Sequence, residues 1–67
     1  MLFKNINKGR NVVTVNGTKA KVVDKNSLTG LVCLSFEVVN GYKTDNDGWW
    51  DPKFIVKTLK GYKLSNR

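Results

Sequence analysis

The stretch Val13-Thr14-Val15-Asn16-Gly17-Thr18-Lys19-Ala20-Lys21-Val22-Val23 decides the fold, because two β-rich runs flank an Asn-Gly pair. A type I′ turn needs positive φ at both central residues, and Asn-Gly adopts that conformation readily. The stretch therefore predicts a tight antiparallel hairpin. Since side chains alternate along a strand, we expect its core face to carry Val13, Val15, Ala20 and Val22.

The run 31–39 is the longest predicted strand, and a polar loop over residues 24–30 precedes it. Alternation places Val32, Leu34, Phe36 and Val38 on one face, at the centre of the expected core. Cys33 lies on the other face and is interpreted as a small, half-buried strand residue.

Residues 40–48 allow two interpretations. Either Asn40-Gly41 closes a second tight hairpin, or the whole segment is one long loop that carries Tyr42 beside the tryptophans. We favour the long loop, because binding residues often lie on such loops.

Pro52 ends the strand that holds Trp49 and Trp50, since proline has no backbone donor for a sheet. We expect a 3₁₀ turn there, capped by Asp51, and a last strand over residues 56–59. Phe36, Phe54 and Ile55 are expected in the core. Residues 1–9 are expected to form a short N-terminal arm, and residues 65–67 to fray.

Five short strands, tight hairpins and a 3₁₀ turn before the last strand resemble the SH3-like small barrel, in particular its KOW and Tudor branches. The resemblance is carried by the stretch from Val13 to Val23 and by Gly48-Trp49-Trp50-Asp51-Pro52-Lys53-Phe54-Ile55. It implies an all-β fold, with one five-stranded SH3-like barrel domain over residues 1–67. Ala20 stands where a KOW motif usually has glycine, and SH3-like barrels serve many unrelated functions.

The chain is strongly basic, with 12 Lys/Arg against 5 Asp/Glu and a formal net charge of +7. Such a balance raises the local concentration of polyanions and predicts a salt-dependent affinity for nucleic acid, DNA or RNA. Only Arg10 and Arg67 are arginines, so reading of guanine edges is not the expected mode. Phosphate contacts and aromatic stacking are expected instead.

Several function classes are excluded or disfavoured by what the sequence lacks. With no histidine and one cysteine, a Cys/His zinc site and an internal disulfide are excluded within one chain. The usual general base near neutral pH is also missing, so we expect a non-enzyme without cofactor or metal. Asp45, Asp47 and Asp51 are interpreted as turn-forming residues, since the terminal glutamate of a calcium loop is missing.

Localisation is predicted from hydropathy. No apolar run reaches the length of a signal-peptide core or a membrane span, so we expect a cytoplasmic protein without a membrane partner.

Two adjacent tryptophans on a strand cannot both point into one core. We expect Trp50 inside and Trp49 outside, where Trp49 and Tyr42 stack on bases or anchor a partner. The lysines expected to contact phosphates are Lys19, Lys21, Lys43, Lys53 and Lys57.

A second hypothesis keeps the same Trp/Tyr patch but changes the partner. A small bacterial or phage-like adaptor or inhibitor would dock a host protein through this patch, with the lysines steering it toward an acidic surface. The aspartates that flank the tryptophans keep this alternative open. A monomer or weak homodimer is expected, the latter through Leu2, Phe3 and Ile6 of the N-terminal arm adding to a sheet edge.

Overall fold

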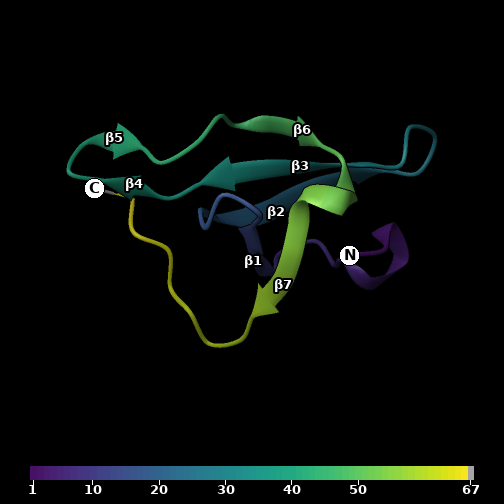
Figure 1. The fold of residues 1–67 in the computed structure, drawn as a ribbon, viewed down its shortest axis with the longest axis horizontal. Helices are drawn as coiled ribbons and strands as arrows, with labels where there is room; N and C mark the ends of the chain where they lie inside the picture. The colour runs from purple at the N-terminus through teal and green to yellow at the C-terminus, as the bar shows by residue number, and fades with distance from the viewer. Residues whose placement is uncertain (67) are drawn as a thin grey trace.

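Five strands form one antiparallel sheet in the computed structural model, which describes residues 1–66 (Figure 1). The sheet order is β6-β3-β2-β1-β7, and β4 and β5 form a separate two-stranded hairpin. The strands are β1 (Asn11–Thr14), β2 (Lys19–Asn26), β3 (Leu31–Phe36), β4 (Val38–Val39), β5 (Tyr42–Lys43), β6 (Gly48–Trp50) and β7 (Ile55–Leu59). Two 3₁₀ turns, η1 (Phe3–Asn5) and η2 (Pro52–Phe54), complete the elements.

The coarse fold prediction is confirmed: the chain is all-β, with a five-stranded antiparallel sheet and a 3₁₀ turn before the last strand. Over residues 1–66 the two edge strands, β6 and β7, do not pair with each other. The sheet is therefore open, and its strand pairing does not close it into a barrel.

The first hairpin forms as predicted, but its turn and register differ by one residue. Only Gly17 of the Asn-Gly pair has positive φ, at 77°. Gly17 N–H donates to the Thr14 carbonyl at 2.9 Å, so Val15 and Asn16 are the central turn residues and Val15 leaves the strand. Val12 consequently pairs with Ala20. The predicted core positions Val13 and Val15 are wrong, because the extra loop residue puts Val12 and Thr14 on the buried face instead.

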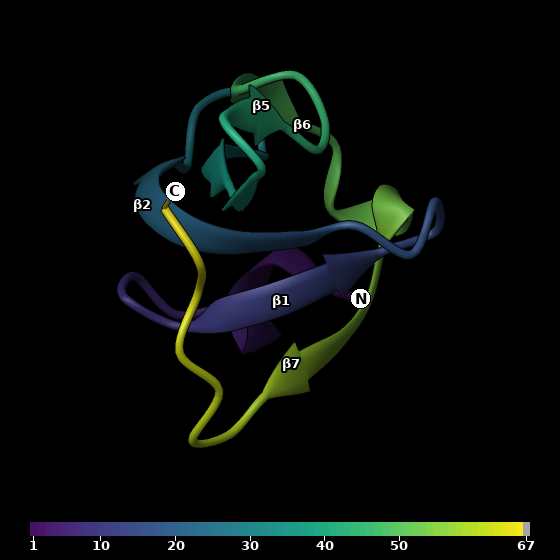
Figure 2. The same cartoon turned by 90° about the vertical axis from the view of Figure 1, so that its left-hand side faces the viewer.

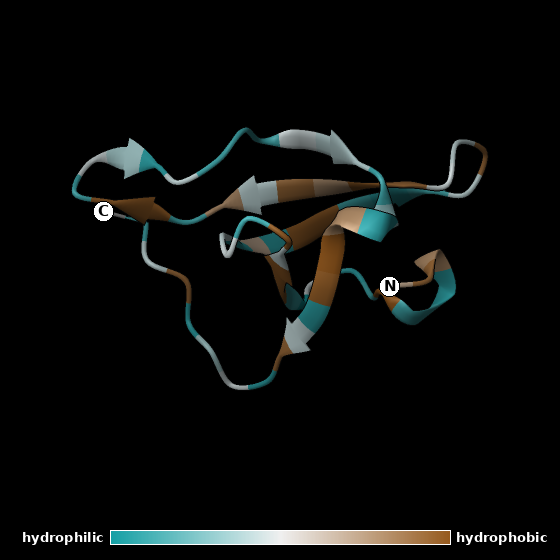
Figure 3. Cartoon of the chain, viewed as in Figure 1, coloured by the Kyte–Doolittle hydropathy of each residue, from teal (hydrophilic) through white to brown (hydrophobic). Residues whose placement is uncertain are grey.

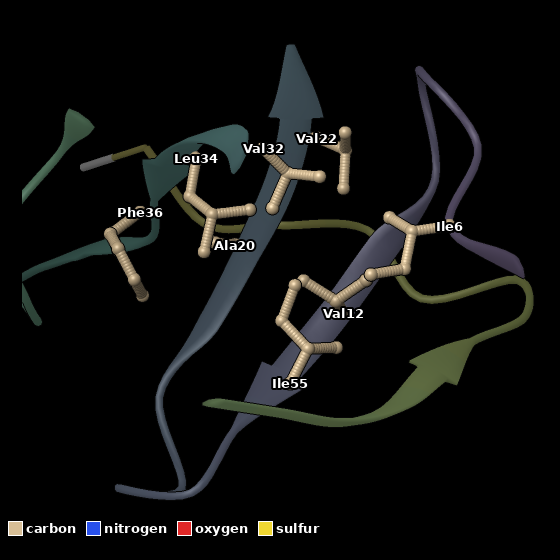
Figure 4. Close-up of a cluster of buried hydrophobic side chains, with 8 residues drawn as sticks. All are labelled: Ile6, Val12, Ala20, Val22, Val32, Leu34, Phe36 and Ile55. Carbon is tan, nitrogen blue, oxygen red and sulfur yellow. The ribbon is translucent and has the colours of Figure 1, made fainter. Parts of the chain in front are cut away.

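The core lies on one face of the sheet and is built from alternate residues of the long strands (Figure 4). Val32, Leu34 and Phe36 of β3 are buried as predicted. Val38 is not part of this core, since β3 ends at Phe36 and Val38 begins the separate hairpin. The buried apolar residues are Ile6, Val12, Ala20, Val22, Val32, Leu34, Phe36 and Ile55.

The N-terminal segment packs on this core and does not project as an arm. Ile6 is fully buried, and Phe3 packs against the same cluster. The Met1 ammonium donates to the carbonyls of Pro52 and Ile55 at 3.0 and 2.8 Å. Ile6 is therefore a core residue. It is not available for the homodimer contact that was expected to add Leu2, Phe3 and Ile6 to a sheet edge.

The second Asn-Gly pair makes the tight hairpin that the first does not. Asn40 and Gly41 have φ of 53° and 81°, and Val39 pairs with Tyr42 across them. Positive φ at both central residues is the requirement of a type I′ turn. The favoured interpretation of residues 40–48 as one long loop is therefore wrong.

The η2 turn forms as predicted, with the Asp51 carboxylate accepting from Lys53 N–H at 3.0 Å. Ile55 then enters the core. Phe54 does not, contrary to prediction: it is 39% exposed, because the short turn buries Pro52 in its place. The last strand, β7, begins at Ile55.

The C-terminal segment after β7 runs past β1 and β2 (Figure 2), and its end lies beside the start of β4 (Figure 1). Val38 N–H donates to the Ser65 carbonyl at 2.8 Å, and Asn66 bridges Val38 in parallel. Residues 65 and 66 are thus held in place, although fraying was expected. Arg67, the last residue of that expectation, lies outside the described residues.

Candidate functional site

The side of the sheet opposite the core, called here the outer face, carries most of the predicted contact residues. Cross-strand partners point to the same face, so the pairing register assigns its members. Trp49 pairs with Cys33, Lys21 pairs with Ser35 and Asn11, and Val13 pairs with both Lys19 and Lys57. The outer face therefore contains Asn11, Val13, Lys19, Lys21, Cys33, Ser35, Trp49 and Lys57.

The two tryptophans take opposite sides of β6, as expected. Trp49 is 49% exposed on the outer face. Trp50 packs against the core, with its ring centroid 5.1 Å from that of Phe36 and 6.0 Å from that of Phe54. Its indole N–H donates to the Asn46 carbonyl at 2.9 Å, so Trp50 is satisfied internally. Of the two indoles, Trp49 is therefore the one that faces solvent.

Three of the five predicted phosphate-contact lysines lie with Trp49 on the outer face: Lys19, Lys21 and Lys57. Lys19 and Lys57 are the cross-strand neighbours of Val13 on its two sides. Lys21 lies one pleat further along β2, two residues from Lys19. Val13 lies between Lys19 and Lys57, and Asn11 is the partner of Lys21 on the same face.

Tyr42, Lys43 and Lys53 lie elsewhere. Tyr42 is 78% exposed on the β4–β5 hairpin, which lies at the far end of the molecule from η2 in Figure 1. Lys43 is engaged: its Nζ is 2.8 Å from Asp47 Oδ2 and donates to the Phe36 carbonyl at 3.0 Å. Lys53 lies on η2, with its Nζ 5.3 Å from the Phe54 ring centroid. The predicted pairing of Tyr42 with Trp49 is not among the aromatic contacts of residues 1–66.

Asp45 and Asp47 serve as internal acceptors. Asp45 accepts from Thr18 Oγ1 at 3.0 Å and from Asn46 N–H at 2.8 Å, which ties its loop to the first hairpin. The Asn46 bond is the largest influence, and it lowers the pKa of Asp45. Burial alone raises the pKa of Asp47, but bonds from Lys43 and from Phe36 N–H outweigh it and leave that pKa lowered. Both aspartates therefore have the structural role expected of turn residues.

Glu37 is a buried carboxylate at the end of β3. Its Oε2 accepts from Tyr62 OH at 2.6 Å and from Ser65 N–H at 3.0 Å. The tyrosine bond is the main cause that lowers the pKa of Glu37, and the same bond raises the pKa of Tyr62. The Glu37 carboxylate is thus bound by two donors of the C-terminal segment.

Asp24 is the acid that the register places on the outer face, through its pairing with Cys33. It is partly compensated, because Lys8 Nζ is 3.9 Å from its Oδ1 and Lys25 N–H donates to the same oxygen at 2.8 Å. Glu37, Asp45 and Asp47 are engaged internally, so Asp24 is the acid that lies nearest to Trp49 in the register, across Cys33, and Lys21 lies further along the same strand.

Tyr62 belongs to the outer face, and sequence reasoning missed it. Lys19 Nζ is 5.4 Å from its ring centroid, and Asn11 Nδ2 donates to its carbonyl at 2.5 Å. Both contacts come from outer-face residues of the sheet. An aromatic residue beside lysines near the chain end was the available signal, but its position depends on contacts 25 or more residues away.

The side chains of residues 1–66 do not form a metal-binding cluster. No group of three or more His, Cys, Asp or Glu side chains that could hold a metal is found there. Cys33 is unpaired and half-buried on β3. None of the helical turns in this part of the chain has the length and apolar character needed to span a membrane.

Comparisons with protein-family models, curated proteins and solved structures gave no significant match. Function is therefore argued from the outer face itself.

Proposed function

We propose that this protein is a non-enzymatic nucleic-acid-binding module that uses the outer face of its sheet. One observation carries the proposal: the pairing register gathers Trp49, Lys19, Lys21 and Lys57 on a single sheet face. Lysine ammonium groups neutralise phosphates and release counterions, and an exposed indole stacks on bases.

An unpaired strand is the form of nucleic acid that this arrangement suits best. Stacking on Trp49 needs a base whose flat face is free, which a single strand or a loop supplies. Lysines are compact point charges that neutralise phosphates without bidentate recognition of bases. Binding is therefore proposed to depend strongly on salt and weakly on sequence.

The SH3-like resemblance is also proposed at the level of the fold. The sheet order β6-β3-β2-β1-β7, with a 3₁₀ turn between β6 and β7, supports it. In this proposal β6 and β7 are the two strands that a closed barrel would bring together, and η2 already joins them in the chain. SH3-like barrels serve many unrelated functions, so the resemblance does not select a ligand, and the proposed surface is argued from its own residues.

Fluorescence anisotropy with a labelled single-stranded oligonucleotide tests the proposal. At low salt we expect saturable binding, and log K should fall linearly with log salt concentration. Trp49→Ala should weaken binding by about 1–3 kcal/mol if one base stacks there. Replacing Lys19, Lys21 and Lys57 with Gln should reduce the salt slope by roughly 0.7 for each phosphate that is no longer neutralised.

Matched controls separate the outer face from general cationic attraction. Tyr42→Ala removes an exposed aromatic residue from the other hairpin, and Lys4→Gln removes a lysine from η1. Both should leave affinity nearly unchanged. Equal reductions in affinity from Lys4→Gln and from a single outer-face lysine variant, or no effect of Trp49→Ala, would contradict the proposal.

A protein partner is the second candidate, and the β4–β5 hairpin is the observation that favours it. Val39 and Tyr42 are exposed side by side there, and Figure 3 shows β4 as a hydrophobic segment at one end of the molecule. Tyrosine is enriched at the centres of protein interfaces. A partner that is retained after nuclease treatment at high salt, and that no longer binds Tyr42→Ala but still binds Trp49→Ala, would favour this function.

A further inference from the structure

A shallow, solvent-open pocket of about 270 Å³ lies where the N-terminal segment passes the start of β1 and the end of β7. It is distinct from the outer-face cluster, since neither Trp49 nor Lys19, Lys21 or Lys57 lines it. Its lining residues are Asn5, Asn7, Arg10, Thr58, Leu59 and Lys60. The lining contains two cationic side chains and two side-chain amides, and it contains no carboxylate.

Backbone hydrogen bonds fix the residues on the N-terminal side of the pocket. Arg10 N–H donates to the Asn7 carbonyl at 3.2 Å, and Gly9 has a φ of 87°, so residues 7–10 form a tight turn. The turn is tied to β2, because Gly9 N–H donates to the Val22 carbonyl at 2.7 Å and Val22 N–H donates to the Arg10 carbonyl at 2.9 Å. Asn7 and Arg10 are therefore anchored at the two ends of one turn.

The pairing of β1 with β7 brings the second cation to the same place. Asn11 pairs with Leu59, so Arg10, just before β1, and Lys60, just after β7, lie at the same end of this strand pair. Both cations line the same pocket, so their charges repel each other. Within residues 1–66 the ion pairs are Lys8–Asp24 and Lys43–Asp47, and neither neutralises Arg10 or Lys60.

We propose that this pocket is a binding site for a phosphate group. The Arg10 guanidinium offers two parallel N–H donors to a tetrahedral oxyanion, and Lys60 adds a point charge. The amide groups of Asn5 and Asn7 provide further N–H donors from the N-terminal side. A bound phosphate would relieve the repulsion between the two cations. The site does not rest on the proposed function of the outer face.

Nuclear magnetic resonance titration of the ¹⁵N-labelled full chain with inorganic phosphate tests this site, with chloride at matched ionic strength as the reference. We expect saturable shifts in the backbone amides of residues 5–11 and 58–60 and in the side-chain amides of Asn5 and Asn7. The double variant Arg10→Gln/Lys60→Gln should weaken phosphate binding at least about tenfold, since it removes both charge-assisted contacts. The equally charged control Lys19→Gln/Lys21→Gln should retain it.

A second arm identifies the source of the phosphate and is run on the Trp49→Ala variant, in which outer-face stacking is removed. A short oligonucleotide with a 5′-phosphate is compared with the same oligonucleotide without it. Saturation by inorganic phosphate supports a free-phosphate site, and saturation only by the phosphorylated oligonucleotide supports a terminal phosphate monoester. The proposal is overturned if neither probe gives saturable shifts at the pocket, or if the Arg10→Gln/Lys60→Gln variant retains them unchanged.

Discussion

The Tyr62 hydroxyl donates to Oε2 of Glu37 at 2.6 Å and so fastens the C-terminal segment to the end of β3. The same oxygen accepts from Ser65 N–H, and the Glu37 carbonyl accepts from both Thr44 N–H and Thr44 Oγ1 at 2.9 Å. Glu37 thus connects three parts of the chain: the sheet, the β4–β5 hairpin and the C-terminal segment. The Glu37 side chain makes the hydrogen bonds to the C-terminal segment.

Tyr62→Phe should loosen the C-terminal segment while leaving the sheet intact. The variant removes the hydroxyl that bonds the carboxylate but keeps the ring beside Lys19. We expect a modest fall in Tm and faster amide exchange confined to the segment after β7, measured by hydrogen exchange. Lys63→Gln, which alters the same segment without touching Glu37, is the matched control. Unchanged exchange in Tyr62→Phe would show that the hydroxyl bond does not hold the segment.

Acid should release the same segment. Because hydrogen bonding from Tyr62 lowers the pKa of Glu37 in the folded chain, the carboxylate binds its proton more readily after unfolding. Its stabilising contribution is therefore fully present above the unfolded pKa of about 4.3 and is lost as pH falls through the lower folded value. Asp45 and Asp47 have lowered pKa values and act in the same direction.

The pH dependence is checked by measuring Tm between neutral pH and about pH 3 for the wild type and Glu37→Gln. The difference in Tm between the two proteins should be largest near neutrality and should shrink in acid, because the wild-type carboxylate becomes neutral there. A difference that stays constant with pH would mean that the charge of Glu37 does not stabilise the fold.

Ile6→Ala should destabilise the whole domain, since Ile6 is fully buried although it precedes the sheet. Truncating a buried isoleucine costs roughly 2–5 kcal/mol, a large fraction of the stability of a small domain. Urea denaturation measures this loss. Leu2→Ala is the control within the same segment, because Leu2 is exposed, and its effect should stay within about 0.5 kcal/mol. Equal effects of the two variants would mean that Ile6 is not a core residue.

Local patterns predicted β3 well and the first hairpin only in part. Val32, Leu34 and Phe36 are buried as their alternation indicates. At Asn16-Gly17, however, the same dipeptide is compatible with a two-residue turn and with a longer loop in which only glycine has positive φ. The choice moves every side chain of β1 to the other face. In the observed loop the buried Thr14 hydroxyl lies beside that of Thr18, and both residues flank the turn.

The candidate site was also predicted only in part. The alternation of side chains along a strand was sufficient to predict that Trp49 and the lysines of β2 and β7 point away from the core. Tyr62 was not predictable in this way, because its place depends on Glu37, which lies 25 residues earlier. Tyr42 was expected near Trp49 because residues 40–48 were interpreted as a loop, whereas Asn40 and Gly41 turn the chain back into a hairpin.

The two adjacent tryptophans should separate cleanly into one stability residue and one surface residue. Trp50 contacts Phe36 and Phe54 and donates to the Asn46 carbonyl, so Trp50→Ala should cost about 3 kcal/mol or more. Trp49→Ala removes a side chain on the outer face and should change stability by no more than about 0.5 kcal/mol. Urea denaturation of both variants checks the difference.

Fluorescence of single-tryptophan proteins tests the same assignment without a large loss of stability. In Trp50→Phe the remaining Trp49 should emit at long wavelength and be quenched readily by iodide, because its indole faces solvent. In Trp49→Phe the remaining Trp50 should emit at shorter wavelength and be protected. Oligonucleotide should quench Trp49 and leave Trp50 unchanged if bases stack on the outer face. Equal quenching of both indoles by oligonucleotide would place the contact away from that face.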